Sequence, residues 1–510
     1  MKFPFALLAV FVLAATAYAE QQFEFSSLEI PGDGRIVVPV VLGESLSGIA
    51  ANVDQRTNGA LTVAAREAVF IGEAGTTLTL YGVAPYSRID LVGVGDKTLD
   101  RVAAENFGGT AAGLLAGATG GSVQILWPAE NADKGATAAR VAFGYRLRSY
   151  RFDRHQAEPV DTATLPVVTL LSDDESETQF RNDLVHIAAG VYFARDMGAE
   201  PANVIYPQSF VDRAKAALNG LDNITIKVLD ENDIQRLGMG ALWGVGKGSA
   251  RPPRLLIIEY MAAGDEAPIV LAGKGITFDT GGISIKSGTN MWRMKGDLGG
   301  AATVTGTMLA IARRGERVNV VGLAALAENM PSGTATRPGD VLESMSGITI
   351  EVISTDAEGR LVLSDAMHYA QLNYKPAVLI DVATLTGSVG RALGDDYAGI
   401  FSRNDELVEP ISAAAADAGE RVWRLPLDDS HFEQIKSKFG DIINSGAGNP
   451  GASVGAAFIG SFVNEGQVWA HLDTAGVDYY EEDRPTVPTG FSGWGVRALD
   501  EYLRRYAAGE

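Results

Sequence analysis

The sequence predicts an α/β fold, with an N-terminal α/β domain followed by a larger C-terminal α/β domain that has a mostly parallel central sheet. Three observations support this prediction. The chain has 510 residues, which is too long for one ordinary domain. Short apolar runs typical of strands alternate with helical patterns throughout. After Pro201 the runs become continuously apolar, as in strands buried on both faces of a parallel sheet.

The composition limits the possible functions. Hydrophobic residues make up 46% of the chain and charged residues 21%, so a large core is expected. The chain has 42 Lys+Arg against 63 Asp+Glu, and this net charge of −21 disfavours nucleic acid as a partner. The absence of cysteine excludes disulfides, thiol nucleophiles and cysteine metal sites. The 59 glycines form no repeat, so we expect them in tight turns.

Residues 1–19 have the pattern of a secretory signal peptide. Lys2 gives a positive start, an uncharged apolar stretch follows, and Ala17-Tyr18-Ala19 supplies a small-x-small cleavage pattern. No later apolar run is long enough to span a bilayer. The sequence therefore predicts an exported protein, periplasmic or secreted, with no membrane anchor after signal cleavage.

Residues 20–178 are predicted to form the N-terminal α/β domain, which carries no recognisable chemical motif. Its strands are expected at 36–42, 78–81, 89–94 and 123–127, and its helices at 101–117 and 136–148.

The acidic stretch 172–177 is expected to be a turn-like junction. Apolar residues then recur at helical spacing, which predicts a connecting helix over 179–198. Gly198 and Pro201 mark its end.

Residues 199–510 are predicted to form the second domain. Ligand sites in such folds lie beyond the carboxyl ends of the parallel strands. Its buried strands are expected at 255–258, 268–272, 318–324 and 377–383, and helices at 301–314 and 361–372.

Four carboxylates follow these strands beside glycine-rich turns: Asp279, Asp297, Asp356 and Glu358. Taken singly, each could be a helix N-cap or a solvated loop residue. If the four converged, they would repel one another and take up protons unless cations balanced them. Oxygen-rich ligand sets suit hard or borderline divalent metals, so the group predicts a metal site.

The spacing Lys274-(x4)-Asp279-(x6)-Lys286-(x10)-Asp297, followed by the run 355–361, resembles the leucine aminopeptidase family of dinuclear-metal, cytosol-type aminopeptidases. The resemblance covers about residues 180–510; the N-terminal part resembles the family only in length and general pattern. Further matching segments are 238–241, 248–254, 329–340 and 381–387.

The resemblance implies a role for each matching residue. Asp279 and Glu358 would bridge two divalent metals, zinc or manganese. Lys274 and Asp297 would complete the tighter site, and Asp356 the exchangeable one.

The family also implies the catalytic groups and the substrate. A water bridging the two metals would attack the peptide carbonyl. Lys286 would stabilise the tetrahedral intermediate, and Arg360 would hold a bicarbonate ion as proton shuttle. The substrates would be peptides with a free N-terminus, leucine or another bulky apolar residue being preferred, and the enzyme would be a homohexamer. The pocket for the first side chain would be lined by Met294, Thr384, Leu385 and Gly387.

Three features depart from the family pattern. Ser354 replaces an asparagine and Leu298 a methionine, and neither change removes a ligand. The third departure is the predicted export signal, which bears on the biological role rather than the chemistry.

Other functions fit the sequence less well. The run 451–455 matches a serine-hydrolase elbow, but it follows a glycine-rich loop rather than a strand, so we expect a packing turn before a helix at 456–463. The run 244–248 lacks full phosphate-loop spacing, and the five histidines lack paired metal spacing. A non-catalytic binding or structural member of the same fold stays open as an alternative.

Overall fold

The computed structural model describes residues 23–128, 132, 134–172, 174–446 and 451–510. The predicted signal peptide, residues 1–19, lies outside the described residues. Among those that are described, no helix has the length and apolar character needed to cross a membrane.

The N-terminal domain is built on a six-stranded sheet with the order β1-β6-β5-β2-β4-β3. All neighbours in this sheet are parallel except β3 and β4, which are antiparallel. The strands are Phe23–Ser27 (β1), Gly34–Val41 (β2), Thr77–Tyr81 (β3), Tyr86–Gly95 (β4), Ser122–Leu126 (β5) and Val167–Ser172 (β6). The α-helices are Gly48–Arg56 (α1), Ala60–Glu67 (α2), Arg101–Leu114 (α3) and Ala138–Arg148 (α4), and Thr162–Thr164 is a 3-10 turn.

Helices α3 and α4 pack backbone against backbone, and glycines permit it. A Cβ on Gly144 would lie 1.8 Å from the carbonyl oxygen of Glu105, and one on Gly108 would lie 1.9 Å from that of Val141. Glycine is therefore needed at this helix crossing as well as in tight turns, which the composition alone did not indicate.

A helical segment, not a turn, joins the two domains. It comprises Asp174–Gln179 (α5), a π-helical turn over Phe180–Leu184 and Val185–Ala199 (α6). The prediction of a turn-like junction at 172–177 is wrong in this respect. The buried ring of Phe180 packs against Phe23 and Phe25 of β1, with ring centroids 5.9 and 5.7 Å apart, and this contact stabilises the helical path.

The C-terminal domain is built on an eight-stranded, mostly parallel sheet with the order β15-β14-β17-β13-β9-β10-β8-β7. Strands β17, β13, β9 and β10 run parallel, whereas β8, β7 and β14 pair antiparallel with a neighbour. The strands are Ile224–Leu229 (β7), Arg254–Met261 (β8), Ile269–Asp279 (β9), Asn319–Asn329 (β10), Val378–Ala383 (β13), Ala398–Phe401 (β14), Val422–Arg424 (β15) and Trp469–Asp473 (β17).

In the described part of this domain, two smaller sheets and helices α7 to α16 complete the fold. The small sheets contain Val341–Glu343 (β11), Thr349–Glu351 (β12) and Ile442–Ile443 (β16), and Tyr479–Tyr480 (β18) and Gly490–Phe491 (β19). The helices are Pro207–Leu218 (α7), Glu231–Arg236 (α8), Gly240–Gly246 (α9), Gly299–Arg314 (α10), Gly359–Tyr374 (α11), Gly387–Leu393 (α12), Asp405–Asp417 (α13), Asp429–Glu433 (α14), Gly451–Gly460 (α15) and Val496–Ala508 (α16), with a 3-10 helix at Met291–Gly296.

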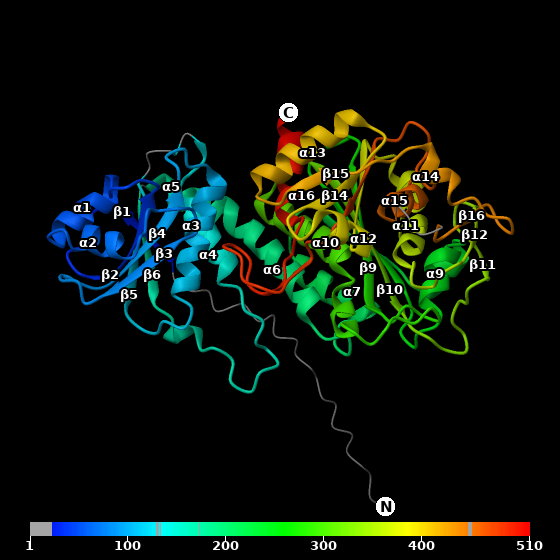
Figure 1. Cartoon of the computed structure of the whole chain (residues 1–510). Coiled ribbons are helices and arrows are strands. Elements are labelled where there is room, and N and C mark those ends of the chain that lie inside the picture. Colours follow the sequence, from blue (N-terminus) through cyan, green and yellow to red (C-terminus); the bar gives the residue numbers. More distant parts are fainter. Residues whose placement is uncertain (1–22, 129–131, 133, 173, 447–450) are drawn as a thin grey trace, which may run out of the picture.

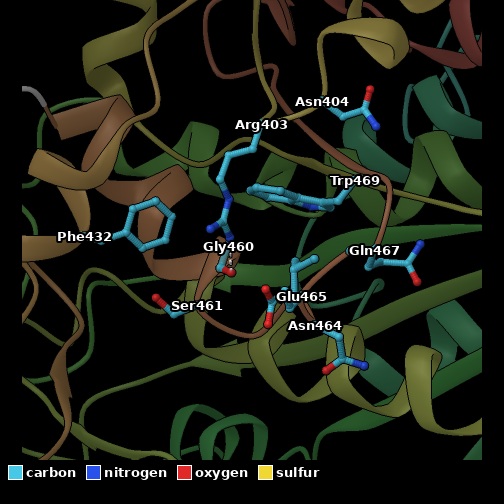
Figure 2. Close-up of a pocket in the computed structure, with 11 residues that line it drawn as sticks. Arg403, Asn404, Phe432, Gly460, Ser461, Asn464, Glu465, Gln467 and Trp469 are labelled. Carbon is cyan, nitrogen blue, oxygen red and sulfur yellow. Dashed lines mark hydrogen bonds between the residues drawn. The ribbon is translucent and has the colours of Figure 1, made fainter.

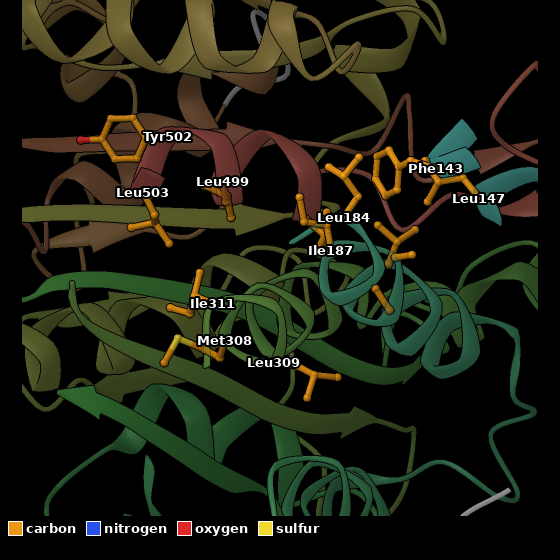
Figure 3. Packing of buried hydrophobic residues seen from close by; sticks show 14 of the residues in the cluster. Phe143, Leu147, Leu184, Ile187, Met308, Leu309, Ile311, Leu499, Tyr502 and Leu503 are labelled. Carbon is orange, nitrogen blue, oxygen red and sulfur yellow. The ribbon is translucent and has the colours of Figure 1, made fainter. Parts of the chain in front are cut away.

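Both faces of the large sheet are covered, which explains its continuously apolar strands. One face packs against α6, α7, α10, α13 and α16, and the other against α9, α11 and α15. The first cluster also takes in α3 and α4, which belong to the N-terminal domain (Figure 1), so one hydrophobic core extends from the large sheet into that domain (Figure 3). The labelled side chains in Figure 3 come from α4, α6, α10, α16 and the turn before α6.

Buried polar contacts also link the domains. Arg195 of α6 is 1% exposed and donates hydrogen bonds to backbone carbonyls of Leu147, Thr486 and Ser492. Glu105 of α3, which is also 1% exposed, pairs with Arg497 of α16 and with Arg140, whose Nη1 lies 2.9 Å from the carboxylate.

We predict that Glu105→Gln lowers the free energy of unfolding by about 3 kcal/mol, because it leaves two guanidinium groups without their buried partner. Urea unfolding at neutral pH measures the change. The control is Asp417→Asn, which removes a carboxylate that is 53% exposed and pairs with Arg101. This variant should lower the free energy of unfolding by about 1 kcal/mol or less. Equal costs for the two variants would contradict the proposed role of Glu105.

Candidate metal centre

Three segments bring charged side chains to the carboxyl edge of the large sheet. Lys274 lies within β9 and Asp279 is its last residue; Asp297 precedes α10, and Asp356 and Glu358 lie in the turn before α11. Because β9, β10 and β13 are parallel, their carboxyl ends meet at this edge.

Two glycines let these segments approach one another. A Cβ on Gly359 would lie 2.5 Å from Cε of Lys274. Gly281 follows Asp279 with φ of +85°, and a Cβ there would lie 2.6 Å from Oδ1 of Asp356. A larger residue at either position would separate groups that the site needs together.

The acids form a compact cluster. Asp279, Asp356 and Glu358 each place one carboxylate oxygen within 4.8 Å of the other two. Asp279 and Glu358 are buried, whereas Asp356 is exposed.

Two lysines lie among the acids. Nζ of Lys274 is 2.8 Å from Oδ1 of Asp297 and 3.0 Å from Oε1 of Glu358. Nζ of Lys286 is 2.8 Å from Oδ2 of Asp279 and 2.6 Å from Oδ1 of Asp356. The structure therefore gathers all five predicted metal ligands and Lys286 into one cluster.

The cluster has donor atoms without partners. Among the described residues, Oδ2 of Asp297 and Oε2 of Glu358 are buried and accept no hydrogen bond. With every group ionised, four carboxylates and two ammonium groups give 2 − 4 = −2. Unsatisfied carboxylate oxygens in a negatively charged, buried cluster fit divalent cations.

The pKa values respond to the crowding of charge. Burial raises the pKa of Asp297 to about 8 and that of Asp279 to about 6, and repulsion from Glu358 adds to both shifts. Burial opposes the charge on Lys274, but Asp297 and Glu358 outweigh it and raise the lysine's pKa. Burial also opposes the charge on Glu358, but the positive charges of Lys274 and Lys286 outweigh it and hold the pKa of Glu358 below its usual range.

Arg360 lies in the first turn of α11 and is buried. Its Nη1 donates to the backbone carbonyl of Asn444 at 2.9 Å, whereas its Nε has no hydrogen-bond partner among the described residues. Burial lowers the pKa of the guanidinium. A buried N–H group without a partner next to Glu358 can bind a small anion.

Thr384 connects the predicted substrate pocket to the cluster. Its hydroxyl donates to Oδ1 of Asp297 at 2.7 Å, and its carbonyl accepts from Nζ of Lys274 at 3.0 Å. Met294 lies in the 3-10 helix before Asp297, and Leu385 follows Thr384. Gly387 opens α12 and is exposed, so its place in a pocket stays a prediction.

Several supporting residues were not found from the sequence. Nδ2 of Asn329, at the end of β10, donates to Oδ1 of Asp279 at 2.8 Å. Asp473 accepts hydrogen bonds from the Thr386 hydroxyl at 2.6 Å and the Leu385 amide at 3.0 Å, which holds the segment after β13. The matching segments 329–340 and 381–387 were the available signals, but neither specifies these pairs.

A buried histidine lies below the same segment. Nδ1 of His471 is 2.6 Å from Oδ1 of Asp381, and Oδ2 of Asp381 accepts a hydrogen bond from Nε1 of Trp469 at 2.8 Å. Burial opposes the charge on His471, but Asp381 outweighs it and raises the histidine's pKa. His471 is fully buried, and its pairing with Asp381 links β17 to β13.

A cavity of about 700 Å³ lies away from this centre, at the opposite edge of the sheet. Figure 2 shows Arg403 beside Phe432 and Trp469 in this cavity; the guanidinium carbon is 4.7 Å from the Phe432 ring centroid, and Nη2 donates to Gly460 at 3.1 Å. None of the predicted site residues lines it.

The two competing motifs have structural roles. The run 451–455 opens α15, so the predicted packing turn is wrong and the helix begins earlier than residue 456. Ser453 is buried there. The run 244–248 includes the end of α9, where a Cβ on Gly244 would lie 2.6 Å from Leu342 and one on Gly246 2.8 Å from Pro253.

Comparison with known proteins gives consistent matches. Residues 192–500 match the model described as "Cytosol aminopeptidase family, catalytic domain", and residues 37–159 match that family's N-terminal domain. A probable cytosol aminopeptidase of Brucella suis is 43% identical over 494 residues, covering 94% of this chain and 97% of the relative. One of Caulobacter vibrioides is 44% identical over 474 residues, covering 90% and 94%.

Solved structures agree in fold. A mutant of tomato leucine aminopeptidase superposes with a TM-score of 0.85 at 32% identity, covering 95% of this chain and 97% of that one. The bottromycin maturation enzyme BotP in complex with Mn gives a TM-score of 0.81 at 28% identity, covering 94% and 100%. These likenesses confirm the predicted two-domain α/β fold.

The expectation of an exported, periplasmic or secreted protein is contradicted. The Brucella and Caulobacter relatives match at least nine-tenths of this chain and are named cytosol aminopeptidases. The predicted signal peptide receives no support from them.

We predict that Asp297→Asn stabilises the metal-free protein at alkaline pH. A carboxyl whose pKa is raised from 3.8 to about 8 binds its proton more tightly when folded, so stability falls as pH rises through this interval. After chelator treatment, the variant should unfold at least roughly 2 °C above the parent protein at pH 9 and nearly together with it at pH 5.

Thermal unfolding across this pH range tests the prediction. The matched control is Asp428→Asn, which changes an exposed carboxylate whose pKa is lowered by hydrogen bonds from Ser430. A parallel pH profile for the parent protein and Asp297→Asn would contradict the raised pKa of Asp297.

Proposed function

The chain belongs to the cytosol aminopeptidase family, and we propose that it removes leucine or another bulky apolar residue from the N-terminus of peptides. Members of this family are metal-dependent aminopeptidases, so the chain is a peptide hydrolase of that class. The observation that carries the proposal is the buried cluster of acids with two unpartnered carboxylate oxygens.

We assign the cluster to two divalent cations, zinc or manganese. Asp279 and Glu358 would bridge them, Lys274 and Asp297 would complete one site, and Asp356 the other. When bound, such cations lower the pKa of a water molecule and polarise the scissile carbonyl.

Lys274 must lose a proton to serve as a ligand. Its amine lies against Asp297 and Glu358, which favour the ammonium form. Cation binding would reverse this preference, because a positive ion takes over the charge balance of both carboxylates. The displaced proton would leave to solvent.

Lys286 supplies a fixed positive charge at the more open side of the cluster. Its side chain is 24% exposed, and Asp279 and Asp356 hold its ammonium group in place. We propose that this group stabilises the negative charge that develops on the substrate's carbonyl oxygen during attack.

Arg360 would hold a bicarbonate ion, which is a proton carrier when bound. The buried Nε without a partner and the neighbouring Nη2, which lies 3.4 Å from a Cβ built on Gly455, form the available donor edge. The resemblance to the family suggested bicarbonate, and the free donor group supports it.

The first side chain of the substrate would lie against Met294, Thr384, Leu385 and Gly387, with the free amine near the Lys274 end of the cluster. Asp473 fixes the backbone of the 384–386 segment by its bonds to Leu385 and Thr386. These bonds would hold the pocket at a fixed position relative to Asp297, because Thr384 contacts Asp297 directly.

We also propose a homohexamer that acts on peptides and binds no nucleic acid. The net charge of −21 supports the exclusion of nucleic acid. Light scattering of the purified protein would distinguish the hexamer from a monomer.

We predict that the protein hydrolyses leucine p-nitroanilide after Mn²⁺ or Zn²⁺ is added, and that a chelator removes the activity. Asp279→Ala should lower kcat by about 1000-fold or more, because it removes a ligand shared by both cations. Asp212→Ala, which changes an exposed carboxylate on α7, should leave kcat unchanged.

Two outcomes would contradict the assignment. Full activity in Asp279→Ala would exclude the proposed ligand set. A folded, metal-loaded parent protein that hydrolyses no peptide or anilide would instead indicate a non-catalytic binding member of the fold.

A further inference from the structure

Asp478 places a fifth carboxylate beside the metal centre. It follows β17 and directly precedes β18. A Cβ built on Gly299, the first residue of α10, would lie 2.4 Å from Oδ1 of Asp478 and 3.3 Å from Cγ2 of Thr384. The carboxylate therefore covers the start of α10 next to Thr384.

Thr384 connects this position to the cluster. Thr384 bonds both Asp297, through its hydroxyl at 2.7 Å, and Lys274, through its carbonyl at 3.0 Å. Gly299, Thr384 and Asp478 are all partly accessible.

The Asp478 carboxylate has no partner. Within the described part of the chain its side chain accepts no hydrogen bond and forms no ion pair of 4.0 Å or less. Burial raises the pKa of Asp478 to about 7, and Arg293 and Lys274 act in the opposite direction. A partly buried carboxylate without a donor in the chain is free to pair with a cationic group from outside it.

The two nearby cations are already engaged. Arg293 pairs with Glu481 at 2.7 Å and lies over the Tyr479 ring, with its guanidinium carbon 4.1 Å from the centroid. Lys274 is held by Asp297 and Glu358.

Helix capping does not account for Asp478 either. An acid at a helix N-terminus is stabilised when backbone amides donate to it. Among the described residues, no amide of the first turn of α10 donates to this side chain.

We propose that Asp478 selects peptides whose first residue is lysine or arginine, by pairing with the cationic end of that side chain. This inference rests on the proposed function and refines its substrate class. The methylene stem would use the same apolar surface that accepts leucine, beside Met294 and Leu385. The charged end would reach the carboxylate beside Thr384.

Three anilide substrates test this selection: those of leucine, arginine and citrulline. Citrulline matches arginine in size but is uncharged. With Mn²⁺ bound, the parent enzyme should prefer arginine to citrulline by about tenfold in kcat/KM, as a charge-assisted bond in a partly buried site gives. Asp478→Asn should bring this ratio close to one and change kcat/KM for leucine by less than about twofold.

Glu482→Gln is the matched control. Glu482 is exposed and lies four residues after Asp478, so the variant removes the same charge outside the proposed contact. It should keep the parent ratio. If Asp478→Asn does not fold, Asp478→Ser provides the same comparison, and a thermal unfolding curve of each variant shows which are folded.

The possible outcomes separate this inference from the proposed function. An arginine-to-citrulline ratio that is near one in the parent enzyme, or that survives Asp478→Asn, overturns the inference. Equal loss of all three activities also overturns it, because the carboxylate would then serve the amine or the fold. A parent enzyme that hydrolyses none of the three refutes the proposed function itself.

Discussion

The crowding of four carboxylates at one buried edge of a sheet is the constraint on which the rest of this structure depends. Two lysines offset only part of their charge, and burial raises the pKa of Asp297 and Asp279 toward neutrality. Such an arrangement costs stability unless cations bind, because each unpartnered carboxylate oxygen has lost its water. A sheet covered on both faces by helices can bear that cost, since its core extends without interruption into the N-terminal domain (Figure 3).

The surroundings of the cluster are arranged to hold it in shape. Gly359 lets α11 start against the stem of Lys274, and Asn329 orients Asp279 from the neighbouring strand. On the other side, Asp473 fixes the segment that carries Thr384, and Thr384 contacts Asp297. Backbone positions and hydrogen bonds therefore set the distances between the proposed ligands without a bound cation, which is the condition for a preorganised site.

The sequence was sufficient to predict the parallel sheet, because strands buried on both faces are continuously apolar, and to predict the acids beyond the strand ends. It was insufficient where tertiary contacts decide. The acidic stretch has the composition of a turn, yet residues 174–177 lie in α5, which the packing of Phe180 against β1 supports. Asp478 belongs to no motif that the sequence analysis identified. Only the folded structure, in which Asp478 and Thr384 both lie against Gly299, shows that its carboxylate is beside the site. Residues 1–19 have the composition of a signal peptide and predicted export. The relatives, which are named cytosol aminopeptidases, contradict that prediction.

The central claim is that five side chains, Lys274, Asp279, Asp297, Asp356 and Glu358, bind a pair of divalent cations. The most direct test is anomalous X-ray diffraction from crystals of the manganese-loaded protein, with elemental analysis of the same preparation. We expect two anomalous peaks per chain within coordinating distance of these residues and two manganese ions per chain in solution. No peak at the cluster, or peaks only elsewhere, would contradict the account.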